Sequence, residues 1–269
     1  MGRIEDDIDK IYFDVCRDLL HAPKVANTRE LNNVKLQLTD IGRNVVSIRG
    51  ISPAYLFAEL LWYFTARNDV KFIGTFASMW KRLSDDGKTC NSAYGYLMER
   101  AHGFNQIEKV IELLKNDPDS RRAVVNLNVP NKNVIETHDE PCTIALQFMI
   151  RHEQLHCTGM MRSNDIWFGL PYDIVFFTEL QKYIADELGV GYGKYTHFVT
   201  SLHMYDRDEE KIAKIVENPI SKPVIFNRKN FHEHGEFIAE LVDRAIEHET
   251  DAKKLLLGLL ETYEIYERG

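Results

Sequence analysis

The fold of this 269-residue chain is decided by one stretch of its sequence, Met161-Arg162-Ser163-Asn164-Asp165-Ile166-Trp167-Phe168-Gly169-Leu170-Pro171-Tyr172-Asp173. Before it, apolar and polar residues alternate from Thr143, the alternation breaks at 152–154, and it resumes through Met161, as in a β-hairpin. After it, a long apolar run over 174–188 predicts a helix. The stretch therefore joins a hairpin to a buried helix through a Gly-Leu-Pro turn.

The rest of the sequence predicts further helices and strands. With 44% hydrophobic residues the chain can bury a full core, and we expect one domain over 1–269 with a helical tail from about 231. The predicted elements are helices over 6–20, 53–64, 106–114 and much of 231–266, strands over 36–48, 123–129 and 198–205, and a polar loop over 21–33.

Composition excludes several classes of partner. The formal net charge is -8 and the isoelectric point about 5.7, so no sequence-wide positive field exists for a nucleic-acid polymer or an anionic membrane. The acidic start at 1–7 lacks the features of a secretory signal, and no apolar run is long enough to span a bilayer. We expect a cytoplasmic protein that binds a small molecule such as a free nucleotide.

The four cysteines, Cys16, Cys90, Cys142 and Cys157, show no pairing or metal-type spacing and are expected to be free thiols. A cysteine is nucleophilic only as a thiolate, which nearby positive charge stabilises. Arg162, on the neighbouring hairpin strand, could supply that charge to Cys142. The alternative is that Cys142 only fills space at the start of a strand.

A carboxyl group at position 59 lies in a strongly apolar predicted helix. An unpaired carboxylate would be costly there, so Glu59 either reaches the surface or faces a cavity as a general acid or base.

Two short motifs offer guanidinium groups and hydroxyls suited to a phosphate dianion. They are Ser120-Arg121-Arg122 and Arg162-Ser163. Surface ion pairs are the alternative explanation, but the clustering favours a phosphate site.

Asp173 is the residue that could read a pyrimidine base. A protonated aspartic acid matches cytosine, because its OH donates to N3 while its carbonyl accepts from the N4 amino group. An amide at this position would instead match uracil. Asp173 also precedes the apolar helix, so a role as its N-cap is the alternative.

Two motifs resemble sites of other classes. His152-Glu153-Gln154-Leu155-His156 matches the HExxH pattern of zinc hydrolases, which requires a helix, but it falls in the predicted hairpin turn. We therefore expect no metal site. Gly189-Val190-Gly191-Tyr192-Gly193-Lys194 imitates a phosphate loop but follows a helix, and Gly189 is better explained as the cap of that helix.

Six motifs occur in order along the chain: Glu59-Leu60-Leu61-Trp62, Ala93-Tyr94-Gly95, Asp117-Pro118-Asp119-Ser120-Arg121-Arg122, Pro141-Cys142, Arg162-Ser163-Asn164-Asp165 with Gly169-Leu170-Pro171, and Ser201-Leu202-His203-Met204-Tyr205. Together they resemble the thymidylate synthase family over about residues 53–205. The resemblance implies an α/β (α+β) fold with a large mixed β-sheet flanked by helices, and a homodimer that packs sheet against sheet.

The resemblance also implies the chemistry. Cys142 would attack C6 of the pyrimidine and make C5 a carbon nucleophile, which takes a one-carbon unit from 5,10-methylenetetrahydrofolate. Glu59 would organise water and proton transfers, and Tyr94 would assist at C5. Asp165 would help hold the pterin and would also bind the substrate.

The same resemblance assigns the binding residues. Trp80, Gly169 and Tyr172 would line the folate site, where Ala77 replaces a second tryptophan of the family. His203 and Tyr205 would hold the sugar 3′-hydroxyl. The phosphate would be bound by Arg162, Ser163 and, less clearly from the local sequence, Arg29, joined by Arg121 and Arg122 of the partner subunit.

Two departures from the family pattern define the subfamily. Thymidylate synthases have His after the nucleophile and Asn at the base-reading position, where this chain has Thr143 and Asp173. The second change is similar to deoxycytidylate hydroxymethylases of phages and cytidylate hydroxymethylases of nucleoside-antibiotic pathways, in which water traps the methylene intermediate. The segment 265–269 does not resemble the apolar tail that closes the thymidylate synthase site, which fits a site that admits water.

The sequence therefore predicts folate-dependent 5-hydroxymethylation of a cytidine monophosphate, with dCMP first. CMP hydroxymethylation and C5 methylation of dUMP or dCMP remain as alternatives, and dihydrofolate release separates methylation from hydroxymethylation. A binding module without catalysis is the alternative from another class, against which Cys142, Glu59 and Tyr94 argue.

Overall fold

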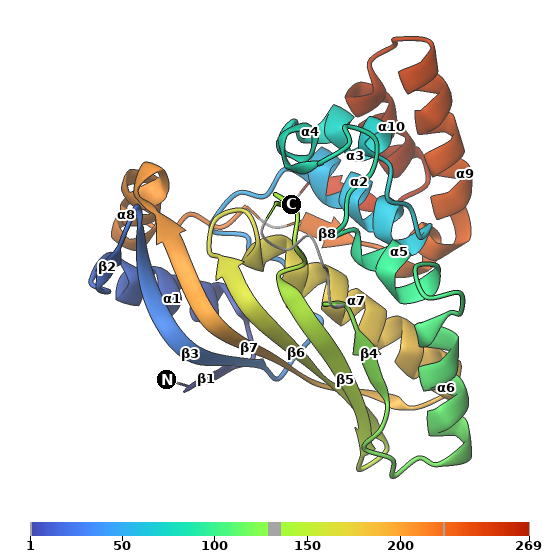
Figure 1. Cartoon of the computed structure of the whole chain (residues 1–269), viewed down its shortest axis with the longest axis horizontal. Coiled ribbons are helices and arrows are strands. Elements are labelled where there is room, and N and C mark those ends of the chain that lie inside the picture. Colours follow the sequence, from blue (N-terminus) through green and yellow to red (C-terminus); the bar gives the residue numbers. More distant parts are fainter. Residues whose placement is uncertain (1, 129–135, 223, 269) are drawn as a thin grey trace. The chain divides into compact units, whose positions relative to one another are not determined.

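A computed structural model describes residues 2–128, 136–222 and 224–268 (Figure 1). The chain divides into two compact units, each assembled from separate segments. The first comprises 1–50, 106–128 and 142–223, and the second comprises 51–105, 129–141 and 224–269. The expectation of a single domain stays a prediction.

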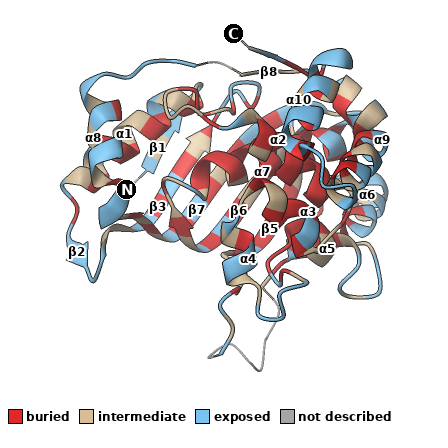
Figure 2. Ribbon diagram, turned by 90° about the horizontal axis from the view of Figure 1, so that it is seen from above, coloured by how far each residue is buried: buried red, intermediate tan, exposed pale blue. Residues whose placement is uncertain are grey.

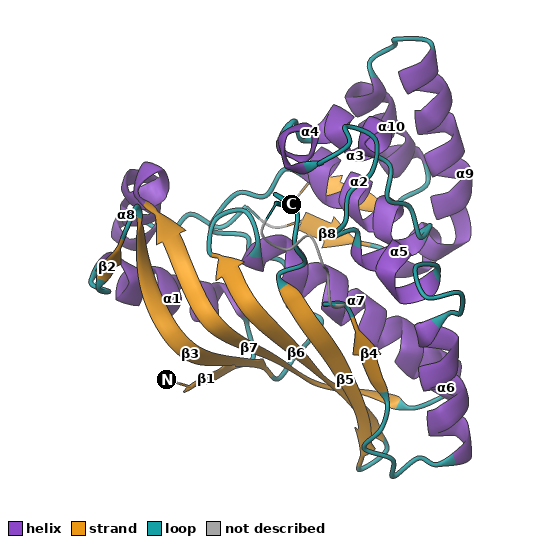
Figure 3. Cartoon of the chain, viewed as in Figure 1, coloured by secondary structure: helices purple, strands orange, loops and turns teal. Residues whose placement is uncertain are grey.

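The first unit is built on a mixed sheet with the strand order β1-β3-β7-β6-β5-β4, and β2 pairs with β3. The β1–β3 and β6–β7 pairs are parallel and the other pairs antiparallel. Helices flank this sheet (Figure 3), so the predicted large mixed sheet flanked by helices is confirmed. The strands are β1 (Gly2–Glu5), β2 (Lys24–Val25), β3 (Thr28–Leu38), β4 (Val124–Asn126), β5 (Thr143–Arg151), β6 (Gln154–Asp165) and β7 (Gly191–Tyr205); the helices are α1 (Ile8–Leu20), α6 (Gln106–Asn116), α7 (Leu170–Leu188), the 3₁₀ turn η1 (Asp206–Asp208) and α8 (Glu209–Glu217).

The predicted hairpin is confirmed as β5 and β6. Its turn contains His152 and Glu153 with φ of 52° and 58°, the left-handed values that a tight two-residue hairpin turn requires. His156 lies on β6. The helix that an HExxH zinc site needs is therefore not formed, and the zinc hydrolase interpretation is wrong.

Helix α7 begins earlier than the sequence predicts. Gly169 is its N-cap and Pro171 lies in its first turn, where the missing N–H of proline costs no hydrogen bond. Asp173 lies inside the first turn, so the N-cap explanation of this residue is wrong. Gly189 ends the helix with φ of 65°, which confirms the predicted cap.

The prediction was also wrong at the start of the sheet. The expected polar loop 21–33 contains β2 and the first half of β3, and the expected strand 36–48 ends at Leu38. Polar residues conceal β3 because its first half is only partly buried, whereas Val34, Leu36 and Leu38 alternate into the core. Pairing with β7 over its whole length makes it a strand.

Burial alternates along the strands and reveals one covered and one open face of the sheet (Figure 2). On β6 the odd positions from Leu155 to Met161 are buried, but the phase then changes, and Asn164 and Ile166 are buried beyond it. On the other face Ile144, Met160 and Phe198 are 43%, 37% and 37% exposed. Met160 and Phe198 are neighbours across the β6–β7 ladder, so these side chains form an apolar patch.

The second unit is mainly helical. The predicted helix 53–64 is confirmed, with Ser52 as its cap, and the predicted helical tail is confirmed as two helices followed by a short strand that pairs with β8. Its elements are α2 (Pro53–Phe64), α3 (Val70–Phe76), α4 (Met79–Leu83), α5 (Tyr94–Glu99), β8 (Val224–Phe226), α9 (Arg228–Glu247), α10 (Ala252–Thr262) and β9 (Tyr266–Arg268). In the described part of the chain, no helix has the length and apolarity needed to cross a membrane.

Candidate active site

Cys142 and Arg162 lie side by side at one end of the β5–β6 hairpin. The Arg162 backbone N–H donates to the Cys142 carbonyl at 2.9 Å, and the next residues, Thr143 and Met161, are paired. Arg162 is exposed and Cys142 is partly exposed. The two residues are therefore neighbours on adjacent strands, and stabilisation of the Cys142 thiolate by the Arg162 guanidinium stays a prediction.

The four cysteines differ in access. Cys16, Cys90 and Cys157 are buried, and burial raises the pKa of the Cys16 thiol to about 12 and that of the Cys157 thiol further. These thiols are protonated and inaccessible at neutral pH. Cys142 is the cysteine placed to react.

Asp173 projects from the first turn of α7 and is partly exposed. Its Oδ2 accepts a hydrogen bond of 2.7 Å from Asn164 Nδ2. Burial of the carboxyl group raises the pKa of Asp173 to about 7, with the charge of Asp165 adding to the effect and the bond from Asn164 opposing it. A substantial neutral fraction therefore exists at pH 7, as cytosine recognition requires.

Behind Asp173 lies a chain of buried polar side chains that sequence reasoning missed. Asn164 Oδ1 lies 3.0 Å from His197 Nε2, and His197 Nδ1 lies 2.8 Å from the Tyr195 hydroxyl. All three residues are at least 98% buried. The available signal was His197, a polar residue on the apolar side of a strand between Tyr195 and Val199.

Asp165 and His203 are paired across the β6–β7 ladder, and Ser163 is paired with Ser201. Burial raises the pKa of Asp165, whose Oδ1 accepts from the Trp167 N–H at 2.8 Å. The His203 ring contacts the Tyr205 ring edge to face, with centroids 5.2 Å apart. The structure thus brings part of the expected binding set together at one end of β6 and β7, namely Arg162, Ser163, Asp165, His203 and Tyr205.

Arg29 lies on β3 beside this group. It pairs with Met204, between the two residues expected to hold the sugar. Its guanidinium donates to Ala22 O at 3.1 Å and to Glu209 Oε1 at 3.3 Å. The predicted phosphate role of Arg29 would require it to exchange the Glu209 contact for a phosphate.

A cluster of aromatic rings surrounds Arg49, which the sequence did not single out. The guanidinium carbon lies 4.6 Å from the ring centre of Trp167, 5.3 Å from that of Tyr172 and 5.9 Å from that of Phe168. Arg49 also donates to the Trp167 carbonyl at 2.6 Å. These contacts order an aromatic surface beside Gly169.

Arg121 and Arg122 are exposed and precede β4 at the edge of the sheet. Ala123 O accepts from Phe148 N, six positions along β5 from Cys142. At about 3.3 Å per residue, these arginines lie roughly 20 Å along the strand from the nucleophile of their own chain. Arg121 and Arg122 are therefore not close to Cys142 within their own chain.

Glu59, Trp80 and Tyr94 belong to the second unit. Glu59 is 94% buried, so the surface interpretation is wrong, and its Oε1 accepts from Tyr55 OH at 2.5 Å. Trp80 Nε1 donates to the same hydroxyl at 3.1 Å. Tyr94 stacks on Tyr63, with centroids 5.3 Å apart.

Gly95 explains how closely this stack is packed. A Cβ atom at position 95 would lie 1.8 Å from the Tyr63 carbonyl oxygen, so only glycine allows α5 to approach α2 here. The structure thus organises the predicted catalytic residues as two groups, one in each unit.

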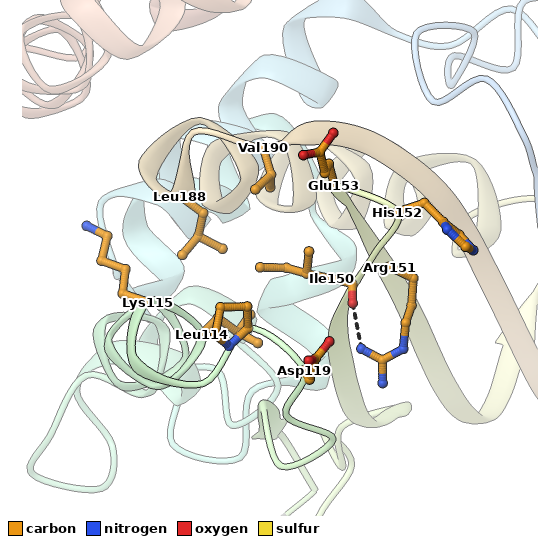
Figure 4. A pocket seen from close by; sticks show the side chains of 10 residues that line it. Leu114, Lys115, Asp119, Ile150, Arg151, His152, Glu153, Leu188 and Val190 are labelled. Carbon is orange, nitrogen blue, oxygen red and sulfur yellow. Dashed lines mark hydrogen bonds between the residues drawn. The ribbon is translucent and has the colours of Figure 1, made fainter.

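The described residues contain no group of three or more side chains suited to a metal ion. A pocket of about 600 Å³ lies at the turn end of the hairpin (Figure 4). Its walls include Leu114, Ile150 and Leu188, and Arg151 turns its guanidinium to the Ile150 carbonyl. None of the predicted catalytic residues lines this pocket, because it lies at the far end of β5 from Cys142.

A family model described as Thymidylate synthase matches residues 11–243. The chain belongs to the thymidylate synthase family. A solved member, the thermostable thymidylate synthase A from Bacillus subtilis, has the same fold, with a TM-score of 0.67 and 21% identity over 82% of this chain and 89% of that chain.

Curated relatives of this thymidylate synthase family member include two phage proteins. The chain is 30% identical over 229 residues to the deoxyuridylate hydroxymethyltransferase of Bacillus phage SP01, covering 78% of this chain and 59% of that protein. It is 31% identical over 179 residues to the deoxyuridylate hydroxymethyltransferase of Pseudomonas phage M6, covering 64% and 51%. The chain thus spans between half and three fifths of these relatives.

Proposed function

We propose that this chain transfers a hydroxymethyl group to C5 of a cytidine monophosphate, preferably dCMP. The observation that carries the proposal is Asp173, whose pKa of about 7 supplies a neutral carboxyl group. Such a group donates one hydrogen bond and accepts another, which matches N3 and the N4 amino group of cytosine.

The reaction follows from the nucleophile. The Cys142 thiolate forms a bond to C6, and C5 then attacks the one-carbon unit. When bound, 5,10-methylenetetrahydrofolate supplies that carbon at the oxidation level of formaldehyde. Tyr94 assists removal of the C5 proton, and cleavage of the bond between the transferred carbon and the folate nitrogen releases tetrahydrofolate and leaves an exocyclic methylene group on C5. Water, organised by Glu59, adds to the exocyclic methylene group, and expulsion of Cys142 restores the C5–C6 double bond.

The binding residues fit the two ligands. Arg162 and Ser163 bind the phosphate, with Arg29 as a further ligand, and His203 and Tyr205 hold the sugar hydroxyl. For the folate, the partly buried Asp165 suits the donors of a pterin, and the aromatic surface around Arg49 suits its flat ring. Gly169, Tyr172 and Trp80 complete that set.

We also propose that the chain acts as a homodimer in the cytoplasm. The exposed Ile144, Met160 and Phe198 form an apolar patch on the open face of the sheet, where a second sheet would bury them. The position of Arg121 and Arg122 also supports a dimer, because they lie too far from Cys142 to act on their own chain's substrate. Four free cysteines suit a reducing compartment.

A second candidate is hydroxymethylation of dUMP, because the two phage relatives are named deoxyuridylate hydroxymethyltransferases. A neutral carboxyl group can also match uracil if its donor and acceptor oxygens are exchanged. The substrate experiment must therefore offer both bases.

The test is a competition. The purified protein is incubated with 5,10-methylenetetrahydrofolate and equal amounts of dCMP, CMP and dUMP, and products are identified by mass spectrometry. We expect hydroxymethylated dCMP and no dihydrofolate. Hydroxymethylated dUMP would establish the second candidate, and a methylated product with dihydrofolate would contradict water trapping. Cys142→Ser should abolish turnover, whereas the matched control Cys157→Ser, on the adjacent strand, should retain it.

The dimer is tested by complementation. Cys142→Ser and the double variant Arg121→Ala/Arg122→Ala should each have little activity alone. Mixed after reversible dissociation, they should regain about a quarter of wild-type activity, because half of the molecules are heterodimers with one intact site. No recovery in heterodimers confirmed by mass spectrometry would contradict the shared site.

A further inference from the structure

The buried polar chain (Asn164, His197 and Tyr195) sits directly behind the carboxyl group of Asp173. Each of its members is almost completely enclosed, and burying polar side chains costs free energy unless their hydrogen bonds are made. Here they are made in sequence, over 2.8 Å, 3.0 Å and 2.7 Å, from Tyr195 to Asp173. The chain ends on the one residue that could read the base.

The hydrogen-bond donors of the buried polar chain all point toward Asp173. Burial lowers the pKa of His197 to about 3, so its ring is neutral and carries one N–H. Asn164 Oδ1 can only accept, so that N–H is on Nε2. His197 Nδ1 is then the acceptor for the Tyr195 hydroxyl. Asn164 is consequently held with its NH₂ group toward Asp173.

Two glycines make room for the two ends of the buried polar chain, Tyr195 and Asn164. A Cβ atom at Gly159 would lie 2.7 Å from the Tyr195 hydroxyl, and one at Gly169 would lie 2.7 Å from Asn164 Nδ2. A side chain at either glycine would therefore require these polar groups to move. The surrounding strands and the start of α7 are thus shaped around these polar groups.

The consequence for Asp173 concerns its two oxygens. Oδ2 accepts from Asn164, which favours Oδ2 as the carbonyl oxygen of the neutral acid and leaves the proton to Oδ1. Oδ1 has no hydrogen-bond partner among the described residues of its unit. The donor and acceptor of this carboxyl group are therefore no longer interchangeable.

Pyrimidines are distinguished by that arrangement. The bond from Cys142 to C6 and the sugar on N1 hold the ring in one orientation, so one oxygen of Asp173 faces position 3 and the other faces position 4. A donor at position 3 matches cytosine, and a donor at position 4 matches uracil. A carboxyl group free to exchange its proton between oxygens would accept both.

We propose that the buried polar chain determines base selectivity, because Asn164 fixes Oδ1 as the donor oxygen of Asp173. Asn164, His197 and Tyr195 are positioning residues that act through Asp173 and do not touch the base. This inference rests on the proposed placement of a pyrimidine nucleotide against Asp173, but not on which pyrimidine is preferred.

The test measures the dissociation constants of dCMP and dUMP by calorimetry without folate, and takes their ratio. For Asn164→Ala, we expect the ratio to move toward one by tenfold or more, because either oxygen of Asp173 can then carry the proton. Tyr195→Phe removes a single hydroxyl with little risk to folding. It should move the ratio in the same direction by a smaller factor, and His197→Gln, which keeps a donor, should move it least.

Asn44→Ala is the matched control. Asn44 is also a buried asparagine that donates to a carboxyl group on α7, Glu179, at 2.8 Å. Any loss of nucleotide affinity in Asn44→Ala should be equal for dCMP and dUMP. The ratio of their dissociation constants should therefore stay unchanged. An unchanged ratio in both Asn164→Ala and Tyr195→Phe, with both proteins folded by circular dichroism, would overturn the inference.

Failure of the cytidine proposal gives a different result. If wild type prefers dUMP, the cytidine proposal is wrong, but Asn164→Ala should still bring the ratio toward one. If wild type prefers dCMP and Asn164→Ala leaves that preference intact, the cytidine proposal stands and the role of the buried polar chain is wrong.

Discussion

Two of the carboxyl groups on helix α7, those of Asp173 and Glu179, are six residues apart and lie in contrasting settings. Asp173 and Glu179 each accept a hydrogen bond from a buried asparagine, Asn164 at 2.7 Å and Asn44 at 2.8 Å. Glu179 also accepts from Lys182 Nζ at 2.7 Å, whereas the described residues provide no ion pair to Asp173.

The difference separates a structural carboxylate from one that can bind a ligand. An amide satisfies an oxygen without supplying a balancing charge, so burial raises the pKa of Asp173 to about 7. The ammonium group of Lys182 balances the charge of Glu179 inside the protein. A buried carboxyl group without a cation is thus the better candidate for recognition.

Removing the cation from the structural carboxyl group should have the largest effect. Lys182→Met removes the cation that is paired with the buried Glu179 carboxyl group, which should lower the free energy of unfolding by about 3–5 kcal/mol. Urea denaturation at pH 7 measures this. The exposed Lys115→Met on α6 is the control and should change stability by less than about 0.5 kcal/mol. A similar loss for both variants would show that the ion pair between Lys182 and Glu179 does not stabilise the fold.

The base preference that results from replacing the Asp173 carboxyl group by an amide should depend on Asn164. An amide that is free to turn can match uracil. In Asp173→Asn, however, the donor of Asn164 should hold the new amide oxygen at the Oδ2 position, so that the NH₂ group replaces the Oδ1 hydroxyl and base preference is kept. In Asp173→Asn/Asn164→Ala the amide can turn over, and preference should shift toward dUMP by about 100-fold, or 2.7 kcal/mol. The ratio of kcat/KM for the two nucleotides measures this, and a full shift in the single variant would contradict it.

The buried imidazole should make the protein sensitive to acid. Because burial lowers the folded-state pKa of His197 to about 3 from an ordinary 6.5, its contribution to stability is complete above pH 6.5 and is lost as pH falls toward 3. At pH 5 the loss should be about 2 kcal/mol. Urea denaturation at pH 7 and pH 5 should show this loss in wild type but not in His197→Gln. The exposed His152→Gln should behave like wild type.

The smallest expected effect is the pH dependence of kcat/KM for dCMP that the titration of Asp173 causes. Cytosine requires the protonated carboxyl group, so kcat/KM for dCMP should fall as pH rises above about 7, by up to tenfold per unit. The neighbouring charge of Asp165 adds to the raised pKa. Asp173→Asn should lack this fall between pH 7 and 8.5, and the same fall in that variant would assign it to another group.

Local sequence patterns predicted the centre of the fold better than its edge. The hairpin, α2 and α7 were predicted because their apolar residues follow a regular period. Strand β3 was missed because Arg29, Glu30 and Asn32 suggest a loop, and only its pairing with β7 makes it a strand.

For the site, sequence identified the reacting groups but not what orients them. Cys142 and Arg162 could be paired through the hairpin, because strand register follows from a short turn. The contact of Asn164 with His197 joins positions 33 residues apart, and Arg49 reaches Trp167 across 118 residues. Such contacts depend on tertiary packing, which residue types and spacing alone do not specify.

The change of phase along β6 has an evolutionary consequence. Between Met161 and Asn164 the buried side of the strand passes from odd to even positions, so Arg162 stays exposed while Asn164 turns inward. Inserting or deleting one residue there would exchange the inward and outward positions on one side of the change. Descendants of this gene can therefore substitute residues in this segment, but gaps in it should be eliminated by selection.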